Sequence, residues 1–141
     1  MPDRWAHLAR IATLALAFAG GAASATDTPP TSIEQTVPGT RWIVVVAEGA
    51  GEPRSIGSYS LRVYVEPEVG GRRDRFVAGA VKSRDGTLEA LRFTDLDRDG
   101  GLELVVTLRS VGTGAYLSAD AWRLRDGVPR LVASVEGLPR D

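Results

Sequence analysis

Four acidic residues follow one another at short intervals in the second half of this 141-residue chain. Asp95, Asp97 and Asp99 occupy alternate positions, Gly100 follows them, and Glu103 stands at the ninth position counted from Asp95. Carboxylate oxygens at positions one, three, five and nine can converge on a hard cation such as Ca²⁺, and a glycine permits the sharp turn that brings them together. These residues are therefore candidate ligands of a structural calcium ion.

The acidic run resembles the calcium loops of propeller repeats and EF-hands, but it departs from the EF-hand at the twelfth position. Val106 stands there, where an EF-hand needs a bidentate glutamate. A metal-free turn is the alternative, because aspartates in turns accept hydrogen bonds from nearby backbone N–H groups. Arg92 and Arg98 would then offset the clustered negative charge. Both interpretations remain open from the sequence.

A second candidate site is a loop of small residues that follows the next apolar run. Gly112 and Gly114 permit backbone conformations that are closed to other residues, and they let a partner approach closely. Ser110, Thr113 and Tyr116 add three hydroxyls, which donate and accept hydrogen bonds and so suit an acidic or sugar-bearing surface. Taken alone, the loop is more typical of an ordinary hairpin connection with Tyr116 at the start of the next strand.

The first 25 residues have the pattern of a secretory signal peptide. Arg4 and Arg10 form a positive beginning, residues 11–18 are apolar, and Ala23-Ser24-Ala25 is a small-x-small cleavage site. The apolar stretch is shorter than the roughly 20 residues that a membrane-spanning helix needs. We therefore expect cleavage after Ala25, a secreted or periplasmic protein, and no membrane attachment afterwards.

Cleavage also removes His7, the one histidine of a chain that has no cysteine. Nucleophilic catalysis by Ser–His or Cys–His pairs, zinc sites of His and Cys, and disulfide bonds are thereby excluded from the mature protein. Fifteen basic and seventeen acidic residues remain, and this small negative balance argues against binding nucleic acid or a membrane surface.

The mature sequence alternates between short strand patterns and turns rich in Gly and Asp. In residues 59–65 every second side chain is apolar, which predicts a strand with Tyr59 in the core, although Ser58 and Tyr59 could instead form a second contact loop. Asp85-Gly86 predicts a hairpin that pairs residues 75–84 with 87–94, and Asp126-Gly127 predicts another turn. The remaining strand patterns cover residues 42–48, 102–109, 116–124 and 131–135.

These patterns predict an all-β fold, an antiparallel β-sandwich or flattened barrel of about seven to eight strands. The Thr/Pro/Ser-rich residues 26–38 are expected to be a flexible leader, and residues 39–141 a single domain. A sandwich of this size with open edges could also pair with a second copy, so a homodimer is a further expectation.

Three segments together resemble the periplasmic inhibitors of invertebrate-type (i-type) lysozyme from Gram-negative bacteria. They are residues 57–64, the acidic turn 95–103, and residues 109–122. The resemblance extends from about Ser58 to Leu138 and is most specific in the third segment. It implies a β-sandwich that is periplasmic, is not an enzyme, and inserts a loop into the substrate cleft of a lysozyme.

The family carries a Ser-Gly-x-Tyr motif in that loop, and Thr113, Gly114 and Tyr116 match it here, with Ala115 between them. Threonine keeps the hydroxyl but adds a methyl group that restricts the rotamer. The resemblance implies that loop hydroxyls bond the two catalytic carboxyl groups of a lysozyme, with Tyr116 as an aromatic anchor. The predicted binding loop comprises Ser110, Gly112, Thr113, Gly114 and Tyr116.

Two other functions compete with lysozyme inhibition. A secreted β-module stabilised by calcium could bind glycan or protein, but propeller modules recur in a chain and this acidic motif occurs once. A hydrolase that uses the acidic turn is the weakest interpretation, because carboxyl groups crowded on one turn cannot flank a glycosidic bond. An inhibitor requires no cofactor, so any calcium would serve only the fold.

Overall fold

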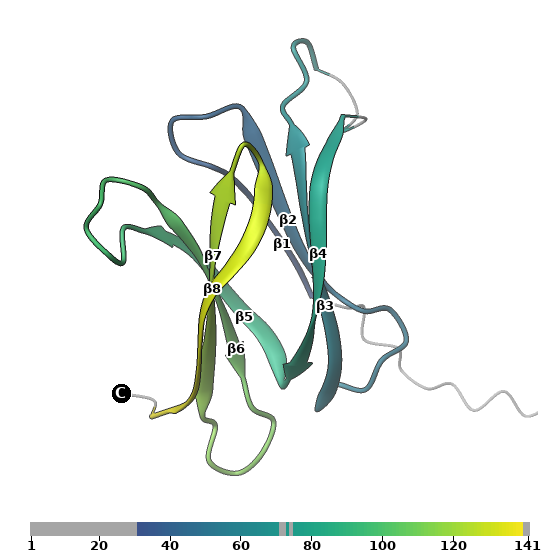
Figure 1. The fold of residues 1–141 in the computed structure, drawn as a ribbon. Helices are drawn as coiled ribbons and strands as arrows, with labels where there is room; N and C mark the ends of the chain where they lie inside the picture. The colour runs from purple at the N-terminus through teal and green to yellow at the C-terminus, as the bar shows by residue number, and fades with distance from the viewer. Residues whose placement is uncertain (1–30, 71–72, 74, 140–141) are drawn as a thin grey trace, which may run out of the picture.

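The computed structural model describes residues 31–70, 73 and 75–139, and it confirms the all-β architecture (Figure 1). No helix occurs among these residues, and so no helix there could cross a membrane. The strands are β1 (Ser32–Thr36), β2 (Trp42–Glu48), β3 (Ile56–Val65), β4 (Phe76–Asp85), β5 (Thr87–Thr94), β6 (Glu103–Arg109), β7 (Leu117–Arg125) and β8 (Val128–Leu138).

Each half of the described chain forms its own antiparallel sheet, with the strands in sequential order. The first sheet runs β1-β2-β3-β4 and the second runs β5-β6-β7-β8. Figure 1 shows them as two layers, with β5–β8 on the left and β1–β4 on the right. Within each sheet, sequence neighbours pair through short connections, as the turn pattern predicted.

The predicted hairpin at Asp85-Gly86 is wrong, because β4 pairs with β3 and β5 pairs with β6. Gly86 has φ +96°, as a tight turn requires, but the turn carries the chain from one sheet to the other. Its N–H donates to the carbonyl of Ser55 at 2.8 Å, and its carbonyl accepts from the Arg84 guanidinium at 2.5 Å. These bonds fix the passage of the chain from the first sheet to the second. A turn signal in the local sequence does not show which strand follows in which sheet.

The predicted turn at Asp126-Gly127 is confirmed. Arg125 and Val128 are paired, so the two residues between them form the whole loop. Both have positive φ, 53° and 78°, which is the type I′ geometry that matches the twist of a two-stranded hairpin.

The flexible leader predicted for residues 26–38 is wrong for residues 32–36, which form β1. This strand pairs with β2 from Ser32 opposite Ala47 to Thr36 opposite Ile43. Its polar composition is that of an edge strand with one solvated face, and only Ile33 packs against the core. The signal peptide and the remaining leader residues up to position 30 lie outside the described residues.

The core lies between the two sheets and follows the predicted alternation on β3. Tyr59, Leu61 and Val63 are fully buried, and they face apolar residues of the second sheet that include Leu104 and Trp122. Tyr59 and Trp122 meet edge to face, with 6.4 Å between ring centroids. The sheets therefore share one hydrophobic core, with one aromatic pair joining them.

Candidate functional site

The loop between β6 and β7 projects from one end of the second sheet, at the bottom of Figure 1. Its two ends are joined by the N–H of Ser110, which donates to the carbonyl of Tyr116 at 2.9 Å. The N–H of Ala115 donates to the carbonyl of Gly112 at 3.2 Å, and the N–H of Gly112 donates to the Ser110 hydroxyl at 3.3 Å. Internal hydrogen bonds thus shape the loop before any partner arrives.

Tyr116 stands out from this loop, and its side chain lies against Gly114. The residue is 55% exposed. A β-carbon on Gly114 would lie 2.6 Å from Cδ2 and 3.0 Å from Cζ of the Tyr116 ring, and closer still to Cε2. Ala115, between them, has φ +46°, a left-handed conformation that costs a non-glycine residue about 1 kcal/mol. The backbone therefore accepts local strain where it presents the ring.

The structure brings all five predicted loop residues together, but their hydroxyls differ in availability. The Ser110 hydroxyl accepts a hydrogen bond within the loop. The hydroxyls of Thr113 and Tyr116 have no hydrogen-bond partner among the described residues, and both residues are exposed. Val111 is also half exposed. The loop thus offers two free hydroxyls, one aromatic ring and one apolar side chain.

A groove of about 410 Å³ runs beside this loop, and no sequence pattern predicted it. Ser110 and Tyr116 form its side on the loop. The first sheet contributes residues 82–85 of β4, and the second contributes Ser134 and Glu136 of β8. Residues far apart in the chain meet here because β4 and β8 are edge strands of different sheets that contact each other.

A buried carboxylate, Asp120, underlies the groove. It is 4% exposed and accepts hydrogen bonds from the hydroxyls of Tyr59, at 2.7 Å, and Ser134. The ammonium of Lys82 lies 3.1 Å from the same carboxylate, and Trp122 donates to the Tyr59 hydroxyl at 3.0 Å. Burial, with the bond to Asp120, raises the pKa of Tyr59. Asp120 lies two residues before Trp122 on β7, so both side chains are on the same face of the strand. This spacing was the one sequence signal that Asp120 points into the core.

Arg84 is a second buried charge that sequence reasoning missed. It is 3% exposed, and its guanidinium donates to the carbonyls of Ser58 at 2.9 Å, Arg54 at 3.0 Å and Pro53 at 3.1 Å. Together with the bond to Gly86, these contacts fix the β2–β3 loop and the sheet crossing next to the groove. Arg84 is therefore part of the support of this end of the molecule.

Ser58 and Tyr59, the candidate second contact, are both engaged inside the protein. Tyr59 has 0% exposure, so the core interpretation is confirmed and the residue offers a partner no surface. The Ser58 hydroxyl donates to the Glu52 carboxylate at 2.8 Å. Hydrogen bonds from the backbone N–H and the hydroxyl of Ser58 lower the pKa of Glu52.

The acidic turn lies at the opposite end of β6 from the loop. Carboxylate oxygens of Asp95, Asp97 and Asp99 lie within 4.8 Å of one another. They also accept hydrogen bonds from the turn's own backbone: Asp95 from the N–H of Gly100 at 2.9 Å, and Asp99 from the N–H of Gly101 at 2.7 Å. This is the pattern expected of the metal-free alternative.

Glu103 does not join these aspartates, so the predicted set of four ligands is not assembled. It is 1% exposed, and it accepts from Arg123 at 2.7 Å and from the N–H of Leu96 at 2.9 Å. Arg123 also bonds Asp97 at 2.6 Å. The carboxylate bonds raise the pKa of Arg123, and the bond from Arg123 lowers the pKa of Asp97. Arg123 therefore offsets the negative charge of the turn, and not Arg92 or Arg98 as the sequence suggested.

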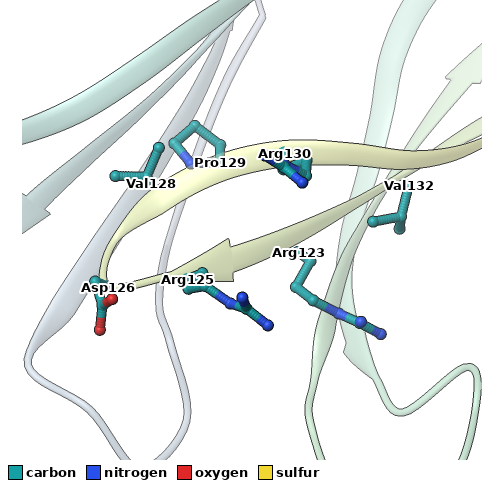
Figure 2. A pocket seen from close by; sticks show the side chains of 7 residues that line it. All are labelled: Arg123, Arg125, Asp126, Val128, Pro129, Arg130 and Val132. Atoms are coloured by element: carbon teal, nitrogen blue, oxygen red, sulfur yellow. The ribbon is translucent and has the colours of Figure 1, made fainter.

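Figure 2 shows a basic hollow at the β7–β8 hairpin, far along the sheet from the loop. It measures about 690 Å³. Arg123 and Arg130 stand opposite each other in the strand register, and Arg125 follows on the same face of β7. Arg123 of this hollow is already paired with Asp97 and Glu103 of the acidic turn, so Arg125 and Arg130 are its basic groups without an ion pair among the described residues.

The comparison with protein families agrees with this all-β structure. A family model described as "Periplasmic lysozyme inhibitor of I-type lysozyme" (PliI) matches residues 31–141. The chain belongs to this family. The match includes β1 and the whole sandwich, and it confirms the resemblance drawn from the three segments.

Two solved PliI structures have the same fold. The first is PliI from Aeromonas hydrophila, with 39% identity and a TM-score of 0.70 over 77% of this chain and 91% of that one. The second is A. hydrophila PliI in complex with Meretrix lusoria lysozyme, with 40% identity and a TM-score of 0.70 over 77% of this chain and 87% of the other. No curated protein matches the chain significantly.

Proposed function

We propose that this PliI-family protein inhibits i-type lysozyme by placing residues 110–116 in the enzyme's substrate cleft. The observation that carries the proposal is the exposed Tyr116 ring, held against Gly114 and next to the free Thr113 hydroxyl. Family membership supports it, and so does the related structure that contains a lysozyme.

The chemistry of the loop suits the chemistry of the target. Lysozymes cleave with two carboxyl groups that flank the scissile bond. The hydroxyls of Thr113 and Tyr116 can donate to those groups, and hydrogen bonds to an ionised carboxylate are the stronger kind. Occupying the carboxyl groups in this way displaces the sugar and the water that the reaction needs. The Tyr116 ring supplies apolar contact area at the centre of the interface.

The shape of the loop lowers the entropic cost of binding. Three hydrogen bonds within the loop and the packing of Tyr116 on Gly114 order these residues in the free protein. An ordered loop loses little conformational freedom on binding, so more of the contact energy appears as affinity. The protein then acts as a stoichiometric inhibitor, and no step of the inhibition needs a catalytic residue or a cofactor.

We also propose that the mature protein is located in the periplasm. A protein cleaved after Ala25 and released into the periplasm would meet lysozyme where peptidoglycan is attacked. Mass spectrometry of the protein purified from a periplasmic extract would test this, with a mature N-terminus at Thr26 as the expected result. Retention of the first 25 residues would contradict it.

Titration of the purified protein against chicken-, goose- and invertebrate-type lysozymes tests the inhibition. We expect stoichiometric inhibition of the invertebrate type, and inhibition about tenfold weaker or more for Tyr116→Ala, because aromatic anchors dominate such interfaces. Tyr64→Ala, a change of the same kind on β3, is the control. Failure to inhibit any of the three enzymes would contradict the proposed function, and full inhibition by a folded Tyr116→Ala protein would contradict the role of the loop.

The same titration in a chelator separates this function from that of a calcium-dependent module. We expect inhibition to persist, because the aspartates of the acidic turn already bond backbone N–H groups and Arg123. Loss of inhibition in chelator, with recovery on adding Ca²⁺, would favour a calcium-stabilised binding module instead.

A further inference from the structure

We propose that the groove between β4 and β8 is a second contact surface, which receives a basic side chain from the rim of the lysozyme cleft. Asp85 and Glu136 are the residues that would hold this side chain. The inference rests on the proposed function and extends it from the loop to the neighbouring surface of both sheets.

The groove is continuous with the binding loop. Ser110 and Tyr116 belong to the loop and also line the groove. A lysozyme whose cleft admits Tyr116 must therefore bring the edge of that cleft over β4 and β8. A loop alone is a narrow contact, whereas specific interfaces bury about 800 Å² on each partner. The groove supplies adjoining surface that such an interface requires.

The charge of the groove follows from which of its ionic groups are already paired. Lys82 is paired with Asp120, and Arg84 is buried against backbone carbonyls. Asp85 and Glu136 are exposed, and neither has an ion pair or hydrogen bond from its side chain to another described residue. The groups left for a partner are therefore two carboxylates, one from each sheet.

A basic side chain at the rim of a lysozyme cleft complements these carboxylates. The substrate of a lysozyme is a polymer that carries carboxylates, and clefts with charge opposite to that of their substrate capture it faster. A guanidinium can bond a carboxylate with two parallel hydrogen bonds.

Charge variants of the two acids test the inference by binding kinetics at low and high salt. The neutral double variant Asp85→Asn/Glu136→Gln should bind an inhibited i-type lysozyme about fivefold more weakly at low salt, mainly through a slower association rate. The reversed variant Asp85→Lys/Glu136→Lys should lose about tenfold or more and reverse the salt dependence. Glu66→Lys is the matched control, because Glu66 is exposed at the opposite end of β3 and should change affinity less than twofold.

The outcomes separate the groove from the loop. Wild-type affinity and salt dependence in both double variants, while Tyr116→Ala still loses inhibition, would overturn the groove inference and leave the proposed function standing. Equal losses in the groove variants and in Glu66→Lys would also overturn it, because the effect would then be one of net charge. Thermal unfolding of each variant verifies the fold, and the single variant Glu136→Gln provides the same test if a double variant does not fold.

Discussion

The ring of Tyr116 occupies the space that a side chain on Gly114 would fill. An ideal β-carbon there would lie 2.6 Å from the ring's Cδ2, so the absence of a side chain at Gly114 permits the position of the tyrosine. Gly114 has no positive φ, and its role is therefore space for the ring rather than backbone freedom. The two residues form one unit of the proposed binding loop.

Gly114→Ala should weaken lysozyme inhibition about tenfold, because the Tyr116 ring must rotate away from the new methyl group. Gly112→Ala is the matched control: its β-carbon would meet the Ser110 hydroxyl oxygen at 3.5 Å, an ordinary contact. Inhibition curves and circular dichroism of both variants make the comparison. Equal inhibition by the two variants would show that the ring orientation is not needed.

Tyr59→Phe should lower the free energy of unfolding by about 2 kcal/mol, because it leaves a buried oxygen of Asp120 and the Trp122 N–H without a partner. Tyr64→Phe is the control. Its ring packs against Phe76, and its hydroxyl bonds no other described residue, so the change should stay within about 0.5 kcal/mol. Urea denaturation followed by tryptophan fluorescence measures both. Similar values for the two variants would rule out a stabilising role for the Tyr59–Asp120–Trp122 contacts.

Arg123→Gln should lower the melting temperature by several degrees, because the buried Glu103 carboxylate then keeps a hydrogen bond only from the N–H of Leu96. Arg125→Gln, on the same strand, has no ion pair among the described residues to lose and should melt like the wild type. Differential scanning calorimetry distinguishes them. A melting temperature for Arg123→Gln equal to that of Arg125→Gln would contradict the compensating role of Arg123.

Acid should remove the stabilisation that Asp97 provides. The bond from Arg123 lowers the folded-state pKa of Asp97 below its ordinary value of 3.8. The contribution is therefore fully present above about pH 4 and is lost as the pH falls through the folded pKa. Asp97→Asn should melt at a lower temperature than the wild type near neutral pH, and the difference should shrink as the pH falls below about 4 and through the folded-state pKa. Melting curves across this range test the sign, and a difference that grows with acidity would contradict it.

Much of the fold was predictable because one face of most strands is buried. The alternation of apolar side chains at Tyr59, Leu61 and Val63 correctly predicts that they face the core, and the Asp126-Gly127 pair correctly predicts a hairpin turn. Gly86 shows the limit of this reasoning. A turn signal specifies local backbone angles, whereas the partner of the next strand depends on contacts from Arg84 to the β2–β3 loop that are distant in sequence.

The loop could be picked out in the sequence and the groove could not, for a related reason. Residues 110–116 are contiguous, so their glycines and hydroxyls can be read together. Asp85 and Glu136 come from edge strands of different sheets and line one groove only after the sheets pack. Glu103 lies apart from the three aspartates because its carboxylate is bonded to Arg123, which stands opposite it on β7 and is distant in sequence.

The single crossing at Gly86 divides the described chain into two consecutive halves, each a complete sheet. Neither half can cover its own apolar face, because the core residues of each are buried by the other. The halves are consequently folding partners and not domains: expressed as separate fragments, they should be unstructured alone and should regain the sandwich, and with it inhibition, only when they are mixed.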